Sequence, residues 1–404
     1  PDIRNLAYDK DPSVRRAAYG AELASYAKIR DAAAFSLNNI KQQTLTMIKL
    51  RHYASPLEET LWQSRMKRET LDAMFTAMRE YFPKFRQYLR RKGELLGHKN
   101  GLPWYDLFAP MGGSSRRFTA QEAKDYLVGI FGGFAEDLAA MVERAFDEAW
   151  IDFYPRKGKQ GGAFCADLYC VRQSRILTNF DGTLSDVVTL AHELGHAYHN
   201  QQIFENRIGN TGYPMPVAET ASNFNETIVM DAAIAAAEGE ERLGLIESQL
   251  QDVTQIMCDI YSRYLFETAV FEKKEDGFLF ADELDGLMLA AQKEAYGDGL
   301  DPEFLHPGMW INKQHYYFSG LNFYNFPYAF GGLFARGLYA QYREEGAAFL
   351  PKYRSLLKAT ATCSVEDAAA MAGIDLTEPD FFEKSLKSYA DRVDEFLSLT
   401  EGMR

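Results

Sequence analysis

The sequence has few cysteines, no long apolar run and no excess of basic residues, and each absence excludes a class of protein. Four cysteines in 404 residues are too few for the disulfide framework of a small secreted protein. No apolar segment reaches the length that crosses a bilayer, and the first residues do not match a secretory signal peptide. We therefore expect a cytoplasmic protein that lives in a reducing compartment and has no membrane partner.

Basic residues are outnumbered by acidic ones. The chain has 44 Lys and Arg against 57 Asp and Glu, a formal net charge of −13. Proteins that bind nucleic acids or anionic membranes need basic faces, so we expect neither as a partner. With 47% apolar residues, 30 Gly and 14 Pro, the composition is that of a globular protein with a large core.

Apolar residues recur at helical spacing along most of the chain. The predicted helices cover residues 13–35, 37–54, 57–80, 119–149, 184–203, 217–237, 240–274, 280–296 and most of 331–398. Between them, short segments at 151–154, 163–168 and 175–180 predict a small sheet. We expect a mainly α protein with a helical lobe over 1–150 and a catalytic region over 151–404. The chain starts within a helical pattern and without an initiator Met, so we expect a fragment or a processed product.

The pentapeptide His192-Glu193-Leu194-Gly195-His196 carries the strongest chemical signal. On a helix, residues four apart project from one face, so His192 and His196 can bind one zinc ion together. Glu193 lies beside the first ligand, where a carboxylate can take a proton from water without binding the metal. The alternative is a pair of surface histidines on a helix.

A catalytic zinc needs a third protein ligand, and two candidates follow the motif. His199 lies on the same helical face, but an uninterrupted helix places it too far along the axis. Glu219 follows a Gly- and Pro-containing loop, at the start of a helix that can return beside the first. Glu226 shares a face with Glu219 and could orient a ligand from behind. The alternative is that these acidic residues only complement the helix dipole.

A peptide hydrolase also needs groups that stabilise an oxyanion. The aromatic segment 310–332 offers His315, Tyr316, Tyr317, Tyr324 and Tyr328, whose N–H and O–H groups are suitable donors. The alternative is that these rings belong to the core.

Five segments resemble segments of one family, in the same order along the chain. They are Trp104–Met111, Ile151–Phe164, Thr189–Ala197, Val217–Ser222 and Phe323–Gly331. Through them the chain is similar to the oligoendopeptidase F branch of the thimet-oligopeptidase-like zinc peptidases, over nearly its whole length. The resemblance implies a mainly α, two-lobed zincin with a deep substrate channel and a small sheet next to the zinc helix.

The resemblance also implies roles for residues that match the family's motifs. His192, His196 and Glu219 would bind one Zn²⁺, with Glu193 as the general base. His315, Tyr324 and Tyr328 would stabilise the transition state, although Pro327 interrupts the spacing of the thimet branch. The segment Gly161-Gly162-Ala163-Phe164 would pair with the backbone of an extended substrate.

The implied activity is endopeptidase cleavage of short, unstructured peptides that can enter the channel. A helical zinc metallocarboxypeptidase is the second enzymatic reading, because it shares a very similar zinc helix. A non-catalytic peptide-binding fragment is the third. Full-length relatives have a further helical region before the point where this chain begins; if that region is absent from the protein, we expect one wall of the channel to be incomplete. The sequence does not predict an oligomeric state.

Overall fold

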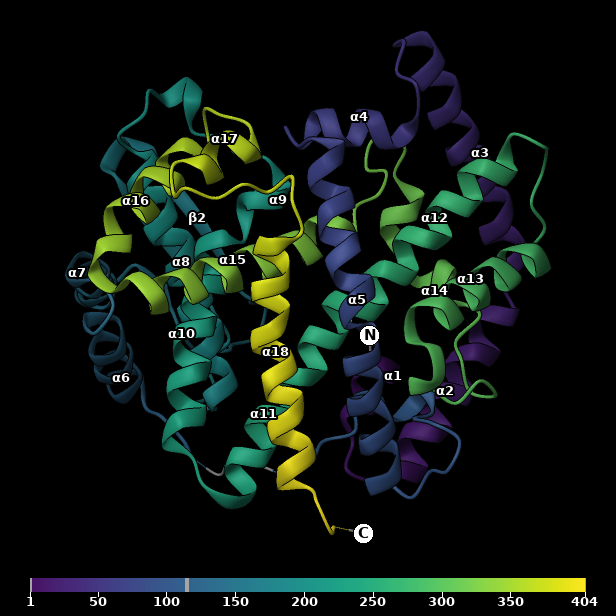
Figure 1. The fold of residues 1–404 in the computed structure, drawn as a ribbon, viewed down its shortest axis with the longest axis horizontal. Helices are drawn as coiled ribbons and strands as arrows, with labels where there is room; N and C mark the ends of the chain where they lie inside the picture. Colours follow the sequence, from purple (N-terminus) through teal and green to yellow (C-terminus); the bar gives the residue numbers. More distant parts are fainter. Residues whose placement is uncertain (1, 113–115, 404) are drawn as a thin grey trace.

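Helices build most of this computed structural model, which describes residues 2–112 and 116–403 (Figure 1). The α-helices are α1 (Asp2–Asn5), α2 (Pro12–Ala27), α3 (Arg30–Leu50), α4 (Pro56–Gln63), α5 (Arg68–Leu95), α6 (Ala120–Gly132), α7 (Glu136–Asp147), α8 (Leu184–Ile203), α9 (Met215–Ala218), α10 (Thr220–Ala236), α11 (Gly239–Thr254), α12 (Ile260–Lys274), α13 (Ala281–Tyr296), α14 (Met309–Asn312), α15 (Phe326–Glu345), α16 (Phe349–Ala359), α17 (Val365–Ala370) and α18 (Asp380–Leu399). Within the described ranges, none of them is long and apolar enough to cross a membrane.

Several long helices predicted from periodicity are interrupted in the structure. The predicted 57–80 helix is split at residues 64–67 between α4 and α5, and the predicted 119–149 helix at 133–135 between α6 and α7. The predicted 240–274 helix contains a π-helical turn at Gln255–Asp259. Apolar spacing continues through such breaks, so periodicity alone does not reveal them.

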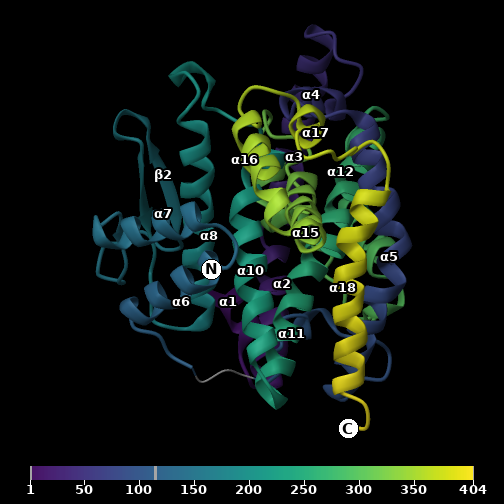
Figure 2. The same ribbon diagram turned by 60° about the vertical axis from the view of Figure 1, so that its left-hand side comes forward.

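The predicted small sheet is present. Its strands are β1 (Ile151–Asp152), β2 (Phe164–Leu168) and β3 (Gln173–Leu177), in the order β1-β3-β2. β1 runs parallel to β3 and β2 runs antiparallel to it, which leaves β2 at one edge of the sheet. Both β2 and β3 contact α8, so the sheet lies next to the helix that carries the histidine pair (Figure 2).

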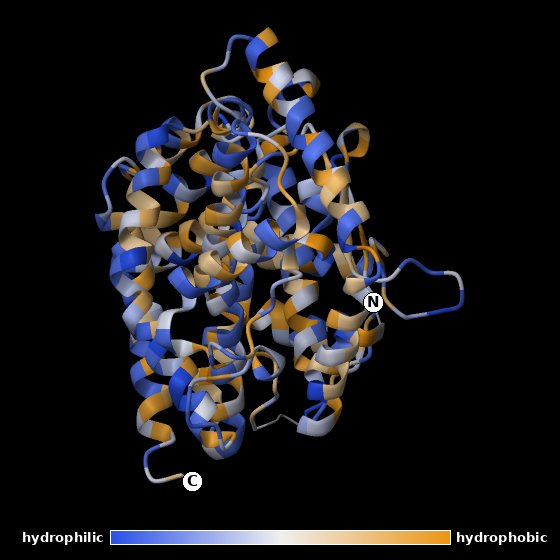
Figure 3. Ribbon diagram, turned by 90° about the vertical axis from the view of Figure 1, so that its right-hand side faces the viewer, coloured by the Kyte–Doolittle hydropathy of each residue, from blue (hydrophilic) through white to orange (hydrophobic). Residues whose placement is uncertain are grey.

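The helices gather into two groups. In Figure 1, α6–α8, α10 and α16 lie on the left, α2, α3 and α12–α14 lie on the right, and α5, α11 and α18 lie between them. Hydrophobic and hydrophilic residues alternate around most helices, which places one face of each against its neighbours (Figure 3). One hydrophobic core runs through both groups, from Leu45 to Phe396.

A domain boundary at residue 150 stays a prediction. The helices that precede it do not all pack with one another, because α6 contacts α10 and α7 contacts α8. Conversely, α3 contacts α12 and α13 from the second half of the chain. The two spatial groups therefore each contain segments from both sides of residue 150.

Candidate metal centre and active site

The helix α8 carries the histidine pair and begins at a well-defined cap. The Thr183 hydroxyl accepts a hydrogen bond from the Asp186 backbone N–H at 3.1 Å, and Asp186 Oδ2 accepts one from the Thr183 N–H at 2.9 Å. This capping box fixes where the helix starts. His192 and His196 are four residues apart on the helix, so their rings lie on one face, with their centroids 4.8 Å apart.

A close helix crossing at Gly195 brings α10 beside that face. The two helices run antiparallel. Asn225 Nδ2 on α10 donates a hydrogen bond to the Ala191 carbonyl on α8 at 3.2 Å. A Cβ atom at Gly195 would lie 2.5 Å from the Ala221 carbonyl oxygen and 2.5 Å from Ser222 Cα. Only a residue without a side chain permits this approach.

Glu219 occupies the junction between α9 and α10, where the backbone turns toward the histidines. Its Oε2 atom lies 3.2 Å from His192 Nε2 and 3.3 Å from His196 Nε2, and the two Nε2 atoms are 3.1 Å apart. Three ligand atoms bound at about 2.0–2.1 Å to one tetrahedral zinc lie about 3.3 Å from one another. Two imidazoles and one carboxylate at these separations fit a catalytic zinc site with one open position.

This triad is also the set of metal-capable side chains that converges in the part of the chain described here. Ser222 donates its hydroxyl hydrogen to Glu219 Oε2 at 2.8 Å, a contact that sequence reasoning missed. The signal for it was a serine one helical turn after the carboxylate. Ser222 holds Glu219 in place, as partners of metal ligands commonly do.

Glu226 lies behind His192, where the sequence predicted an orienting group. Its Oε1 is 2.9 Å from His192 Nδ1, so His192 Nδ1–H donates to it and leaves Nε2 directed at Glu219. Burial lowers the pKa of His192, but hydrogen bonds to Glu219 and Glu226 outweigh it and raise the pKa to about 10. Burial acts in the opposite sense on Glu219, yet its hydrogen bonds to His192 and His196 hold its pKa well below the usual range.

Glu193 differs from the other carboxylates in lacking a partner. Its side chain is buried, with 5% exposed, and its Oε2 has no hydrogen bond within the described chain. Burial raises the pKa of Glu193, against the opposing charges of His192 and His196. A buried, unpaired carboxylate oxygen beside a metal-ligand cluster can accept and return a proton.

His199 does not belong to the cluster. It is fully buried, its Nε2 lies 2.8 Å from Thr360 Oγ1, and its ring stacks on Tyr213 at 4.5 Å. Burial lowers the pKa of His199 to about 3, so the ring is neutral. Of the two third-ligand candidates, the structure therefore places only Glu219 against the histidine pair.

His315, Tyr324 and Tyr328 form an aromatic cluster on the Glu219 side. The rings of His315 and Tyr324 are 4.8 Å apart, and those of Tyr324 and Tyr328 are 5.6 Å apart. The Tyr324 hydroxyl reaches Met215 Sδ at 3.4 Å, at the start of the short helix that ends at Glu219. The three predicted donors thus lie together, and one of them contacts the short helix that precedes Glu219.

The two other tyrosines of that segment lie elsewhere. Tyr316 is buried in a hydrophobic core beside Phe266, with ring centroids 5.2 Å apart. Tyr317 donates its hydroxyl hydrogen to the Trp310 carbonyl at 3.2 Å. For these two, the core alternative is the one that the structure favours.

The loop and strand predicted to bind substrate lie beside α8. Asn179 Nδ2 donates to the carbonyls of Gln160 and Gly162, both at 2.9 Å, and so holds the loop that leads through Gly161 and Ala163 into β2 at Phe164. The edge strand β2 contacts α8, where Asn200 Nδ2 lies 4.0 Å from Cys165 Sγ. Burial raises the pKa of the Cys165 thiol to about 12.

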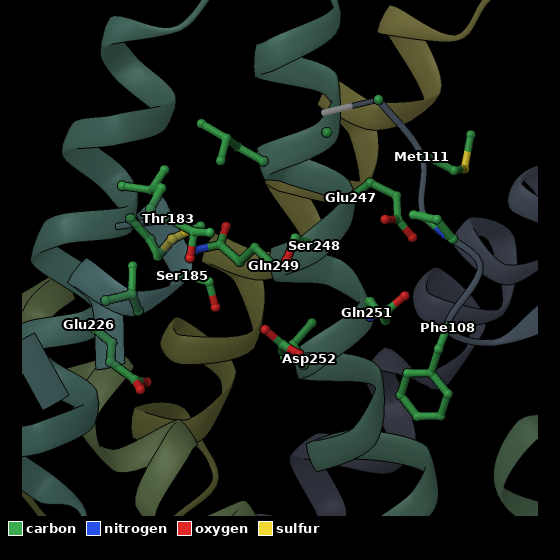
Figure 4. A pocket seen from close by; sticks show the side chains of 18 of the residues that line it. Phe108, Met111, Thr183, Ser185, Glu226, Glu247, Ser248, Gln249, Gln251 and Asp252 are labelled. Carbon is green, nitrogen blue, oxygen red and sulfur yellow. The ribbon is translucent and has the colours of Figure 1, made fainter. Parts of the chain in front are cut away.

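Glu226 also lines a cavity of about 680 Å³ (Figure 4). Its lining includes Phe108, Met111, Ser185, Glu226, Ser248 and Asp252. Burial raises the pKa of Asp252 to about 7, and the negative charges of Glu226 and Glu247 add to the shift. Sequence reasoning missed Asp252, because no motif surrounds it on α11.

Comparison with known proteins gives the same family along almost the whole chain. Residues 5–388 match the model of peptidase family M3. The oligopeptidase PepF of Bacillus subtilis is 26% identical over 404 residues, which cover 98% of this chain and 59% of PepF. The chromosomal oligoendopeptidase F of Lactococcus lactis subsp. cremoris is 27% identical over 403 residues, which cover 98% of this chain and 66% of that protein.

Solved structures share the fold. A crystal structure of a protein from Chlamydophila abortus superposes with a TM-score of 0.87 at 22% identity, covering 98% of this chain and 66% of that one. The chain thus spans about three fifths to two thirds of the length of these relatives. Because the family match extends over most of the sequence, the chain belongs to peptidase family M3.

Proposed function

We propose that this chain is a zinc-dependent endopeptidase that hydrolyses short, unstructured oligopeptides. The observation that carries the proposal is the convergence of His192 Nε2, His196 Nε2 and Glu219 Oε2, with pairwise distances of 3.1–3.3 Å. These residues would hold one Zn²⁺. When bound, the zinc ion would polarise a substrate carbonyl and make water a stronger nucleophile at neutral pH.

Glu193 is the general base in this proposal. Its unpaired Oε2 takes a proton from the attacking water and later delivers it to the leaving amine. Burial, which raises the pKa of Glu193, makes its protonated form easier to reach during the reaction. Glu226 orients His192 through the 2.9 Å contact to Nδ1.

His315, Tyr324 and Tyr328 supply hydrogen-bond donors for the developing oxyanion. The Tyr324 ring lies 4.8 Å from that of His315 and 5.6 Å from that of Tyr328. Burial and the neighbouring Tyr324 raise the pKa of the Tyr328 hydroxyl, so it keeps its proton and acts as a donor. Donors that are fixed before the reaction stabilise charge without reorganisation.

The free edge of β2 offers a place for the substrate backbone. An extended peptide can add to a sheet edge through main-chain hydrogen bonds, and the segment Gly161–Phe164 leads into that edge. A peptide must be extended to pair in this way. Short and unstructured substrates therefore suit the site.

A reducing, cytoplasmic setting suits the four free thiols.

Product analysis tests this function. The zinc-loaded chain is incubated with capped and uncapped oligopeptides, and the fragments are identified by mass spectrometry. Internal cuts in a capped peptide, abolished by a chelator and restored by zinc, are the expected result. Release of single C-terminal residues would make the chain a carboxypeptidase instead, and peptide binding without chelator-sensitive hydrolysis would make it a binding fragment.

A further inference from the structure

Tyr324 sits at the tip of a turn with an unusual backbone. The preceding residue, Phe323, has a φ of +53° although it is not glycine, and its side chain is buried. The Asn325 N–H donates to the Phe323 carbonyl at 2.7 Å and closes a three-residue turn around Tyr324. Left-handed backbone at a bulky residue persists only where surrounding contacts enforce it.

One carboxylate oxygen contacts both neighbours of Tyr324. Glu267 Oε2, from α12, accepts hydrogen bonds from the Phe323 backbone N–H at 3.0 Å and from Asn325 Nδ2 at 3.2 Å. Asn325 Oδ1 in turn accepts from the Phe326 N–H at 2.6 Å and caps α15. Glu267 therefore fixes the turn on each side of the tyrosine and ties it to the start of a long helix.

The other oxygen of Glu267 is paired with a lysine from a distant part of the sequence. Lys41 Nζ, on α3, lies 2.6 Å from Glu267 Oε1, and the two side chains are only 1% and 2% exposed. Lys41 also donates to Asn322 Oδ1 at 3.3 Å and lies over the Phe271 ring at 4.7 Å. A buried carboxylate stays charged when a buried ammonium neutralises it, and a charged acceptor makes the stronger hydrogen bonds.

Within the described residues, neither Lys41 nor Glu267 contacts the triad of His192, His196 and Glu219. The Lys41–Glu267 pair therefore has no direct part in the chemistry. We propose that Glu267, held by Lys41, is a positioning residue that places the Tyr324 hydroxyl beside the candidate metal centre. This inference rests on the proposed function of Tyr324 as an oxyanion donor.

The test compares two buried carboxylates, each with one oxygen that accepts both a backbone N–H and a side-chain donor. Glu267→Gln removes the negative charge and leaves one acceptor oxygen, for which Lys41 and the turn then compete. Glu366→Gln is the matched control, because Glu366 Oε1 also accepts a backbone N–H, from Lys67 at 2.8 Å, and a side-chain donor, Thr70, at 2.6 Å. We expect Glu267→Gln to lower kcat about tenfold to hundredfold with KM nearly unchanged, because a misplaced donor acts on the transition state. Glu366→Gln should leave both constants nearly unchanged.

A double-mutant cycle separates positioning from general damage. In a Tyr324→Phe background, Glu267→Gln should lower kcat less than about threefold, because the group that it positions is already gone. If Glu267→Gln does not fold, Asn325→Ser is the second variant, since serine keeps a capping oxygen for Phe326 and loses the contact with Glu267. An equal loss of kcat in both tyrosine backgrounds would overturn the proposal.

A spectroscopic readout keeps the inference independent of activity. With 3-fluorotyrosine incorporated at position 324, the ¹⁹F resonance should be single and narrow in the wild-type and Glu366→Gln chains, and shifted or broadened in Glu267→Gln. A wild-type resonance in Glu267→Gln refutes the positioning role. A zinc-loaded wild-type chain that cleaves no peptide refutes the proposed function instead, and the ¹⁹F comparison still decides the role of Glu267.

Discussion

At the scale of single residues, the carboxylates around the histidine pair differ in what they contact. Glu219 Oε2 is close to both imidazoles and accepts from Ser222, and Glu226 is held by His192 Nδ1. Glu193 Oε2 has no such partner and is buried. Hydrogen-bonded carboxylates are fixed in place as ligands or supports, whereas the unpaired one is free to exchange a proton.

The first prediction concerns Glu193. Glu193→Gln keeps the size of the side chain and removes its basicity, so kcat should fall about 10²- to 10⁴-fold while zinc is retained. Cleavage of an internally quenched peptide measures kcat, and elemental analysis of the same sample gives the zinc content. Turnover at the wild-type rate would show that Glu193 is not the base.

The second prediction concerns Glu226. Because Glu226 holds His192 through Nδ1, Glu226→Gln should weaken zinc binding about 10- to 100-fold. Competition with a chromophoric chelator measures the affinity. Asp252→Asn is the control, since Asp252 lines the same cavity and contacts no residue of the triad. Equal zinc affinities in the wild-type and Glu226→Gln chains would show that Glu226 does not support zinc binding.

Some of these side chains could be predicted from the sequence and others could not. His192, Glu193 and His196 follow from spacing on one helix, because helix geometry alone brings them together. Glu219 was one of two open choices until the fold placed His199 in the core. Glu267 could not be predicted, because its role depends on contacts across 56 and 58 positions of the chain.

At the scale of elements, the crossing of α8 and α10 builds the candidate centre. Gly195 lies in van der Waals contact range of the α10 backbone, where a methyl group would overlap Ala221 and Ser222. The third prediction concerns Gly195→Ala. The added methyl group would push α10 away from α8, which should destabilise the protein by about 1–3 kcal/mol. The same displacement would move Glu219 away from the histidines and weaken zinc binding.

Gly129→Ala provides the matched comparison for this prediction. Gly129 is also helical, and a Cβ atom there would meet nothing within 4 Å. Alanine should therefore stabilise α6 by about 0.5–1 kcal/mol through its better helix propensity. Thermal unfolding and zinc titration of both variants make the comparison. If the Gly195→Ala variant is as stable as Gly129→Ala and its zinc affinity is unchanged, the close approach of α8 and α10 at Gly195 does not position Glu219.

The boundaries of the elements show where local signals suffice. The 184–203 helix was predicted with its observed ends, since Thr183 and Asp186 form a capping box at its start. The predicted 217–237 helix breaks at Glu219, which lies between α9 and α10. That break has no glycine or proline at the position itself, and tertiary contacts with the two histidines accompany it.

At the scale of the whole molecule, buried charges join segments that are distant in the sequence. Glu22 on α2 is within 3.5 Å of His306 Nε2, within 3.1 Å of Arg4 Nε and within 2.5 Å of the Tyr26 hydroxyl. Burial raises the pKa of Glu22, but the nearby His306 ring and the hydrogen bonds from Tyr26 and Arg4 outweigh it and lower the pKa to about 2. The carboxylate therefore links the N-terminal helices to the segment before α14.

The fourth prediction is a pH dependence of stability. A carboxyl whose folded pKa is depressed stabilises the fold above its unfolded pKa, near 4.5, and this contribution disappears as the pH falls toward 2. Glu22→Gln should cost about 1–2 kcal/mol at pH 7, allowing for partial solvent screening, and much less near pH 2. Urea unfolding across this range measures the difference. The exposed Glu143→Gln is the control, and a Glu22→Gln effect that does not shrink at low pH would contradict the account.

The most direct measurement of the central claim is the zinc content of the native chain and of Glu219→Ala, after dialysis against a limiting chelator. The account predicts one zinc ion per wild-type chain and almost none in Glu219→Ala, because two imidazoles alone hold the ion weakly. Full occupancy in Glu219→Ala would place the third ligand elsewhere. A wild-type chain that binds no divalent ion would contradict the candidate metal centre itself.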